Sequence, residues 1–559
     1  MKSSRGDEYL LAELTEKFEQ NLGDWRSSEA TRRVWDKDTA LWSSGDEDRW
    51  LAWLEVVAAQ RGQVEKIEAL SLRVRDEGIT DVLLLGIGGS SLGPEVVAET
   101  FGRIPGHLAL HVLDSTVPDQ VRRFREGLDL SKTLILVASK SGSTVEPNVL
   151  LDYFLAELDN VITKPGRNIM AVTDPGSALE QRAADQEFRA VFEGVPEIGG
   201  RFSALSAFGL VPAGLVGVDL TVYLDRAGRM VDACRYDDEN PGVMLGAALG
   251  AAWSAGRDKV TLIVSPGQWD IGAWIEQLVA ESTGKSGIGL CPIDQEPELA
   301  PDDYQNDRIF VYLRQEDSAD SEQDDRVARL FYAGQPTITL RSVDAYDLGA
   351  EFYRWEFATA VVGSFMRINP FDQPNVQESK DITSALLSAY ENDGELAEPK
   401  TAGNIGSVVV TASGGQDTAE DTIRSLFESI RSGDYFTILA YCDRTSKAQE
   451  TFSRIRQRVA ESRKVATTLG YGPRFLHSTG QLHKGGQNRG VFLMVTTRPD
   501  IDLAIPGKMA TFGVLSRAQA LGDFQVLAEN GRRVVWLDLS EGLDQGLAEI
   551  DSAVSAALG

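Results

Sequence analysis

Apolar residues in this chain form two patterns, short continuous runs and longer stretches at helical spacing. The runs at Asp81–Leu85 and Thr133–Ala138 consist mainly of Leu, Ile and Val, as expected for parallel strands buried on both faces. A helical pattern follows the second run, from Val149 to Leu158. With further strand-like runs at Leu108–Leu113 and Asn168–Val172, the alternation of strand and helix predicts an α/β fold with a doubly wound parallel sheet.

The same alternation begins again after a polar, turn-rich segment at Tyr236–Gly242. Helices are predicted at Trp269–Ser282 and Ala350–Met366. The acidic segment Glu316–Arg326 lacks apolar periodicity and is predicted to be a solvated loop. The strands of this second series are predicted at Lys259–Val264, Gly287–Pro292, Arg308–Leu313 and Thr337–Leu340.

The two ends of the chain differ from these central series. The first 78 residues are predicted to be helical, with their tryptophans packed against the first domain (Trp25, Trp35, Trp42, Trp50 and Trp53). Asp393–Asn404 is rich in charge, Gly and Pro and is a candidate linker, and Ala448–Thr467 is a long charged helix. Strands are expected near it at Ser407–Thr411, Phe436–Tyr441, Gly490–Val495 and Val534–Leu539. We therefore predict an N-terminal helical segment (1–78), a first domain (79–240), a second domain (241–392) and a C-terminal α/β region (393–559) that completes the second domain.

Two predicted turns between strand and helix carry unusual chemistry. Ser139–Thr144 contains four hydroxyl groups and one lysine, and Ser143 with Glu146 forms a capping-box pattern at the start of the next helix. Gly86–Pro94 combines glycines, which allow close approach of the backbone to a ligand, with Ser90 and Ser91. Free N–H groups and the helix dipole favour an anion at such turns. Two hydroxyl-rich turns on nearby strands predict a clamp for a phosphate monoester.

Overall charge and cysteine content narrow the possible partners. The chain has 559 residues and a net charge of -29, which disfavours nucleic acid and acidic membrane surfaces. Cys234, Cys291 and Cys442 lie far apart, without zinc or disulfide spacing. No signal peptide or membrane-spanning run is recognised, so a cytoplasmic protein is expected.

Three separate segments supply candidate charged groups. Arg201 follows Gly199 and Gly200, an arrangement that suits contact with a ligand oxygen. Glu281 lies at the end of an apolar helix, where a carboxylate can act as a base. Lys380 closes a segment dense in turn residues and can donate a proton or hold an anion. Taken singly, Arg201 is equally compatible with a surface arginine, and a solvated side chain is the more common interpretation for Glu281 and Lys380.

Half of the four histidines lie in one glycine-rich segment near residue 480. His477 and His483 have no Cys or paired carboxylate at metal-ligand spacing, so we predict no metal site and no cofactor. An imidazole in such a loop is a candidate acid–base group.

Five of these segments, in their order along the chain, resemble the glucose-6-phosphate isomerase family. The matching blocks span about residues 40 to 385 and read GIGGSSLGP, SKSGSTVEP, GGRFS, ESTGK and FDQPNVQESK. The later segment LHSTGQLHKGG resembles the isomerase portion of the bifunctional transaldolase/glucose-6-phosphate isomerase group. The resemblance implies two sugar-isomerase (SIS-type) domains, a homodimer and a sugar-phosphate substrate, with a transaldolase chain as a candidate partner.

The resemblance also implies a role for each site residue. Glu281 would move the proton between C1 and C2, Arg201 would stabilise the enediolate, and Lys380 with a histidine would open the sugar ring. The phosphate and the sugar would be bound by Gly88, Gly89, Ser90, Ser139, Lys140, Ser141, Thr144, Gly200 and Gln373. In the usual isomerases the catalytic histidine lies between the blocks of Glu281 and Lys380, where this chain has none. His477 is the proposed replacement because its HS-x-GQ context is similar, and His483 is the competitor.

Two other functions remain compatible with these patterns. A non-catalytic sugar-phosphate sensor would need the two hydroxyl turns but not Glu281, Arg201 and Lys380 together. A dinucleotide-binding enzyme could use Gly86-x-Gly88 and Asp114, although Ser91 stands where that fingerprint has its third glycine. The joint presence of base, cation and lysine favours the isomerase.

Overall fold

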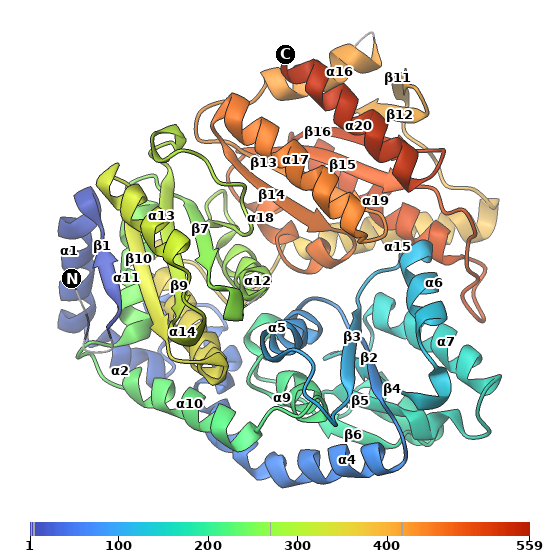
Figure 1. Cartoon of the computed structure of the whole chain (residues 1–559), viewed down its shortest axis with the longest axis horizontal. Helices are drawn as coiled ribbons and strands as arrows, with labels where there is room; N and C mark the ends of the chain where they lie inside the picture. The colour runs from blue at the N-terminus through green and yellow to red at the C-terminus, as the bar shows by residue number, and fades with distance from the viewer. Residues whose placement is uncertain (2, 4–5, 269, 415–417) are drawn as a thin grey trace.

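The computed structural model describes residues 1, 3, 6–268, 270–414 and 418–559. Its strands form three sheets, which occupy three parts of the molecule in Figure 1. In each sheet a central strand lies between the two strands that follow it along the chain: β2 between β3 and β4, β7 between β8 and β9, and β13 between β14 and β15. The predicted α/β class with doubly wound parallel sheets is confirmed.

The first sheet has the order β3-β2-β4-β5-β6, and its neighbouring strands are parallel. Two apolar runs of the sequence match β2 and β4 to the residue, because both strands are buried on both faces. The strands are β2 (Asp81–Leu85), β3 (Ala109–Leu113), β4 (Thr133–Ala138), β5 (Ile169–Thr173) and β6 (Ala190–Glu193). The helices are α5 (Leu92–Phe101), α6 (Pro118–Gly127), α7 (Val145–Asp159), α8 (Ala178–Asp185), α9 (Ala207–Leu215) and α10 (Leu220–Ala233).

The second sheet has the order β1-β10-β9-β7-β8 and takes its antiparallel edge strand from the N-terminus. The strands are β1 (Glu8–Leu10), β7 (Lys259–Val264), β8 (Cys291–Ile293), β9 (Arg308–Gln315) and β10 (Thr337–Ser342). The helices that follow residue 240 are α11 (Pro241–Ser254), α12 (Ile271–Thr283), α13 (Ser321–Tyr332), α14 (Leu348–Met366) and α15 (Val376–Asp393). The N-terminal helices are α1 (Thr15–Ser27), α2 (Ala30–Trp35), α3 (Val56–Gln60) and α4 (Val64–Asp76).

The prediction for the tryptophans is confirmed for Trp35 and Trp53, because Trp35 Nε1 donates to the carbonyl of Cys234 at 3.1 Å and the rings of Trp53 and Phe202 are 5.4 Å apart. The position of β1 corrects it for Trp25 and Trp42. Because β1 joins the second sheet, α1 lies along α11, at the left of Figure 1. Trp42 donates from Nε1 to the carbonyl of Ala360 at 2.7 Å, and the rings of Trp25 and Phe365 are 5.8 Å apart. These two tryptophans therefore pack against the helix α14 of the second domain and not against the first domain.

The C-terminal strands form a third sheet of their own, in the order β11-β12-β16-β15-β13-β14. The sequence predicts that this region completes the second domain, but its ladder hydrogen bonds join β11–β16 to one another. The strands are β11 (Thr401–Ile405), β12 (Val408–Ala412), β13 (Tyr435–Tyr441), β14 (Ala466–Tyr471), β15 (Gly490–Thr497) and β16 (Arg533–Leu539). The helices are α16 (Ala419–Glu428), α17 (Ser446–Arg463), α18 (Gly480–Gly485), α19 (Phe512–Glu529) and α20 (Leu543–Leu558).

Three further expectations need correction. The acidic segment predicted as a loop enters α13, which Asp320 caps and in which Val327 and Leu330 are the buried side chains. One buried pair is too little apolar periodicity to reveal a helix in the sequence. The candidate linker ends inside β11, and the long charged helix stops at Arg463, before β14. The helix predicted at Trp269–Ser282 corresponds to α12, and its first predicted residue, Trp269, lies outside the described residues.

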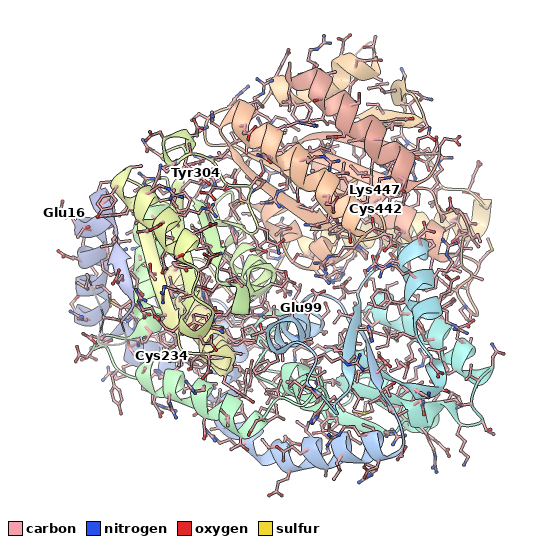
Figure 2. All side chains as sticks on the ribbon, viewed as in Figure 1. Glu16, Glu99, Cys234, Tyr304, Cys442 and Lys447 are labelled. Atoms are coloured by element: carbon pink, nitrogen blue, oxygen red, sulfur yellow. The ribbon has the colours of Figure 1, made fainter. Side chains whose placement is uncertain are left out.

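All three cysteines are buried, and none of them takes part in a disulfide bond. Figure 2 shows Cys234 in the lower left part of the molecule and Cys442 in the C-terminal part, far from each other. In the part of the chain that the structure describes, no helix has both the length and the apolar character required to span a membrane.

Candidate active site between the three sheets

A cavity of about 360 Å³ is lined by residues from all three sheet units. The predicted site residues in its lining are Gly88, Gly89, Ser90, Lys140, Ser141, Thr144, Gly200, Arg201, Glu281, Gln373, Lys380 and His477. Ser139 lies behind this lining, 2% exposed, and donates a hydrogen bond to Thr144 Oγ1 at 3.3 Å. The fold thus brings residues separated by almost 400 positions into one cleft.

Glycines of the first turn allow three segments to meet at this cleft. Gly88 has a φ of +58°, and a Cβ atom there would lie 2.9 Å from the carbonyl oxygen of His477. A Cβ on Gly89 would lie 2.1 Å from the carbonyl oxygen of Gly200. Larger side chains would therefore push the segments of His477 and Gly200 away from the turn.

The second turn presents its hydroxyl groups to the cleft, but not in the predicted cap geometry. Ser141 Oγ and Ser143 Oγ are 3.0 Å apart, and α7 begins after Thr144 without a side-chain cap. The capping box of Ser143 and Glu146 is therefore not formed. Without that cap, the first turn of α7 keeps N–H groups available to an anion.

Lys140 is already engaged on the opposite side of its turn. Its ammonium donates to Asp174 Oδ2 at 2.5 Å and to the carbonyl of Val195 at 2.7 Å. An ammonium has three N–H groups, so one donor is left for a ligand. Sequence reasoning did not identify Asp174, which also lines the cleft.

Glu281 and Arg201 face each other in the interior of the cleft. Glu281 is 8% exposed, and its Oε1 lies 3.6 Å from Arg201 Nη1. Burial lowers the pKa of Arg201, while the charge of Glu281 acts in the opposite direction. The guanidinium also donates to Ser282 Oγ at 2.7 Å and to Gln373 Oε1 at 2.9 Å, so its orientation is fixed. A carboxylate held beside a fixed cation is suited to accept a proton and to leave negative charge stabilised nearby.

Gln277 connects this carboxylate to the histidine segment. Its Nε2 donates to Glu281 Oε2 at 3.2 Å and to the backbone carbonyl of His477 at 2.8 Å. Sequence reasoning missed this residue, although it precedes Glu281 by one helical turn on α12 and shares its face.

His477 enters the cleft from the loop after β14 and meets a buried carboxylate. Its Nε2 is 3.2 Å from Glu146 Oε1, and Gln519 Nε2 donates to the same oxygen at 2.7 Å. Burial acts to raise the pKa of Glu146, but the charge and hydrogen bond of His477 lower it below its usual value. Glu146 therefore remains a carboxylate that orients the imidazole.

The competing histidine lies outside the cleft. His483 is 3% exposed, and its ring is 5.1 Å from the ring of Phe492 and 6.2 Å from that of Phe475. Burial and the nearby charge of Lys484 lower its pKa well below the usual value. His483 is thus a neutral core side chain.

Lys380 differs from the other predicted charges because its side chain is exposed. It lies on α15 at the edge of the cleft, and its charge contributes to the lowered pKa of Glu146. An exposed ammonium at the cleft entrance can reach a ligand without first breaking a buried ion pair.

The structure offers little to a dinucleotide or a metal. Asp114, the candidate ribose ligand, accepts from Ser91 Oγ at 3.0 Å and from Arg474 Nη2 at 3.1 Å and is 3% exposed. Within the described residues, no group of three or more His, Cys, Asp or Glu side chains is placed to hold a metal ion.

Comparisons of the sequence relate the chain to known enzymes. A model of the family described as phosphoglucose isomerase matches residues 50–289. The chain is 30% identical over 428 residues to the glucose-6-phosphate isomerase of Synechococcus sp. (strain JA-3-3Ab), covering 62% of this chain and 76% of the relative. It is 30% identical over 376 residues to the glucose-6-phosphate isomerase of Rubrobacter xylanophilus, covering 58% of this chain and 87% of the relative.

Solved structures share the fold over about two thirds of the chain. A hypothetical protein from Thermus thermophilus aligns with a TM-score of 0.57 and 25% identity, covering 68% of this chain and 99% of that one. A glucose-6-phosphate isomerase from Chlamydia trachomatis aligns with a TM-score of 0.58 and 19% identity, covering 67% and 86%, which bears on the fold alone. The chain covers most of the length of the two sequence relatives at 30% identity. It therefore belongs to the phosphoglucose isomerase family of enzymes.

Proposed function

We propose that this enzyme interconverts glucose 6-phosphate and fructose 6-phosphate through an enediol. The observation that carries the proposal is the convergence of Glu281, Arg201, Lys380 and His477 on the cavity that also holds the hydroxyl turn. A sugar-phosphate sensor would require the turn but not these four groups together.

The phosphate group binds at the start of α7. Ser141 and Thr144 donate from their hydroxyls, Ser90 contributes from the first turn, and Ser139 holds Thr144 in place from behind. Lys140 adds the third N–H of its ammonium while it remains paired with Asp174. Hydrogen bonds to a charged phosphate are among the stronger ones in proteins.

Ring opening needs one proton removed and one delivered. His477, oriented by Glu146, accepts the proton of the C1 hydroxyl, while Lys380 donates a proton to the ring oxygen as the C1–O5 bond breaks. The products are an aldehyde at C1 and a hydroxyl at C5.

Isomerisation then moves a proton between two carbons. Glu281 removes the proton from C2 as the C1=C2 double bond forms, and His477 returns the proton that it took from the C1 hydroxyl to the aldehyde oxygen, which gives the enediol. Glu281 then delivers its proton to C1 while the C2 hydroxyl passes its proton to His477 and becomes the ketone. Arg201, 3.6 Å from Glu281, stabilises the negative charge that develops on the oxygens.

A coupled assay tests the proposal directly. Fructose 6-phosphate is supplied together with a dehydrogenase that oxidises only glucose 6-phosphate, and the reduced nicotinamide is followed by absorbance. The wild-type enzyme should give a signal, and Glu281→Gln should lose about two to four orders of magnitude in turnover while still binding the sugar phosphate. No signal from the wild type with retained binding would favour the sensor instead, and near-normal turnover by Glu281→Gln would remove it as the base.

We also propose a homodimer, as the resemblance implies. Light scattering of the purified enzyme at several concentrations measures the mass directly. A mass near 60.9 kDa at all concentrations would contradict the dimer.

A further inference from the structure

Two buried cations donate to the same backbone turn, Asn369–Asp372, which joins α14 to α15. Arg201 Nη2 donates to the carbonyls of Pro370 at 2.7 Å and Asp372 at 3.1 Å. Lys285 Nζ donates to the carbonyl of Asn369 at 2.7 Å, to the carbonyl of Asp372 at 2.5 Å and to its carboxylate, also at 2.5 Å. Lys285 belongs to the ESTGK segment, and the function described above gives it no role.

The residues after this turn are part of the cleft. Gln373 accepts from Arg201 Nη1, and Lys380 follows on the second turn of α15. Asn375 is held from the other side, because its N–H donates to Gln481 Oε1 at 2.9 Å while Gln481 Nε2 donates to the carbonyl of Gly284 at 2.8 Å. The turn is therefore tied at both ends to the segment that ends α12.

We propose that Lys285 is a positioning residue for the isomerase reaction, fixing the turn of Gln373 and the helix of Lys380 relative to Glu281. This inference rests on the proposed function. Lys285 lies four residues after Glu281, so its three hydrogen bonds connect the base to the ring-opening side of the cleft. Charge-assisted bonds to backbone oxygens are directional enough to hold such a turn.

The surroundings of Lys285 make this contact sensitive to pH. Burial and the charge of Arg201 lower its pKa to about 8, while Asp372 and Glu281 act to raise it. The charged form is present below about pH 8 and is lost as the pH rises through that value. Deprotonation removes the charge and one N–H donor, so the turn is held less firmly in alkaline solution.

The test compares pH profiles of kcat and KM for the wild type, Lys285→Met, Lys285→Arg and Asp372→Asn. For the wild type, kcat should fall as the pH rises through about 8. Lys285→Met should lower kcat at pH 7 by about 10- to 100-fold, the order of effect expected when reacting groups are displaced by about 1 Å, and should abolish the alkaline step. KM should change much less, because the phosphate turn is not touched.

Two variants keep the test informative if Lys285→Met folds poorly. Lys285→Arg retains a charge at high pH and should remove the alkaline fall in kcat while keeping measurable activity. Asp372→Asn removes the carboxylate that raises the pKa of Lys285, so the fall in kcat should move to lower pH.

Lys259 offers a matched control away from the cleft. It is 1% exposed and donates to Asp258 Oδ1 at 2.7 Å and to the carbonyl of Gly433. Lys259→Met should lower thermal stability and leave the pH profile of kcat unchanged. An unchanged profile in the Lys285 and Asp372 variants, or the same change in Lys259→Met, would overturn the positioning role while the isomerase activity stands. An inactive wild type would overturn both.

Discussion

The first and third sheets share the order of their parallel strands around β2 and β13, but the loops after these strands have different roles. In the first sheet, the loops after β2 and β4 carry the glycines and hydroxyls that line the cleft. In the third sheet, the loop after β13 carries Asp443, which accepts from Arg123 of α6 at 3.0 and 2.8 Å, and Arg444, which donates to Glu95 of α5 at 3.2 Å. The edge that commonly binds ligands in such folds is occupied here by contacts with the first domain.

The comparison shows that the strand topology determines where the loops meet at one edge of a sheet. The residues in these loops determine whether that edge lines a cleft or contacts another domain. Small and hydroxylated residues leave backbone N–H groups open to an anion, whereas paired charges join two domains. In the described lining of the cleft, His477 is the residue that the C-terminal region contributes. The third sheet therefore supports the site mainly by carrying one side chain to it.

Removing that side chain should have the largest effect. His477→Ala should slow turnover of the cyclic substrate by about two to four orders of magnitude, because general acid–base assistance to ring opening is lost. Turnover of an open-chain analogue should fall much less. Steady-state kinetics on both substrates measure the difference.

His483→Leu is the control for this prediction, because it changes a buried histidine of the same region. It should leave the ratio of rates on the two substrates unchanged. Equal losses on both substrates for His477→Ala would contradict a role in ring opening.

The next effect concerns the contact between the first domain and the C-terminal region. Burial acts to raise the pKa of Glu95, but Arg474 and Arg444 lower it from 4.5 to about 2. Its stabilising contribution is therefore present above about pH 4.5 and is lost as the pH falls towards 2, on the order of 3 kcal/mol in total. Glu95→Gln should remove most of this acid sensitivity, as measured by urea unfolding between pH 3 and 7; the same pH dependence in both proteins would contradict it.

A smaller effect is expected at Ser139–Thr144, the turn that is proposed to bind the phosphate. Thr144→Val keeps the shape and removes one hydrogen bond to a charged group, worth roughly 1.5–3 kcal/mol, so KM should rise by about 10- to 150-fold. Thr445→Val is the matched change in the third sheet, where Thr445 Oγ1 accepts from the N–H of Ala448 at 3.2 Å. It should cost about 1 kcal/mol of stability and leave KM unchanged. Similar KM values for both variants would remove the functional difference between the two sheets.

The smallest effect should come from the ion pair between the half-exposed Arg123 of α6 and the buried Asp443 of the third sheet unit. The side chain of Arg123 is 48% exposed, so Arg123→Ala should change the free energy of unfolding by about 0–1 kcal/mol. Chemical denaturation measures this change. A loss well above that range would mean that the contact with Asp443 holds the two domains together.

The sequence predicted the elements whose burial is uniform. β2, β4 and β7 were assigned to the residue because most of their positions are apolar and nearly all are buried. α13 was missed because most of its side chains face solvent, and β14 was missed because it follows α17 after only two residues. A helix that is buried only along one narrow side gives too weak a hydrophobic periodicity to be recognised in the sequence.

The site residues also divide into those that a local sequence pattern predicted and those that depend on contacts between distant segments. Glycine- and hydroxyl-rich turns after apolar strands indicated the proposed phosphate site without knowledge of packing. The role of Glu146 could not be inferred, because its contact with His477 joins residues 331 positions apart and replaces the local cap that the sequence favoured. Lys140 was assigned to the ligand because the sequence gives no sign that Asp174 and Val195 would share it.

The strand β1 also has a consequence for the synthesis of this protein. It pairs with β10, about 330 residues later in the chain, so its partner is not yet made when β1 leaves the ribosome. At about 5–20 residues per second, the edge strand waits roughly 20–60 seconds for its place in the sheet. During that time its unpaired N–H and C=O groups can join other strands. A strand of only three residues, Glu8–Leu10, limits that hazard because it offers few groups to a wrong partner.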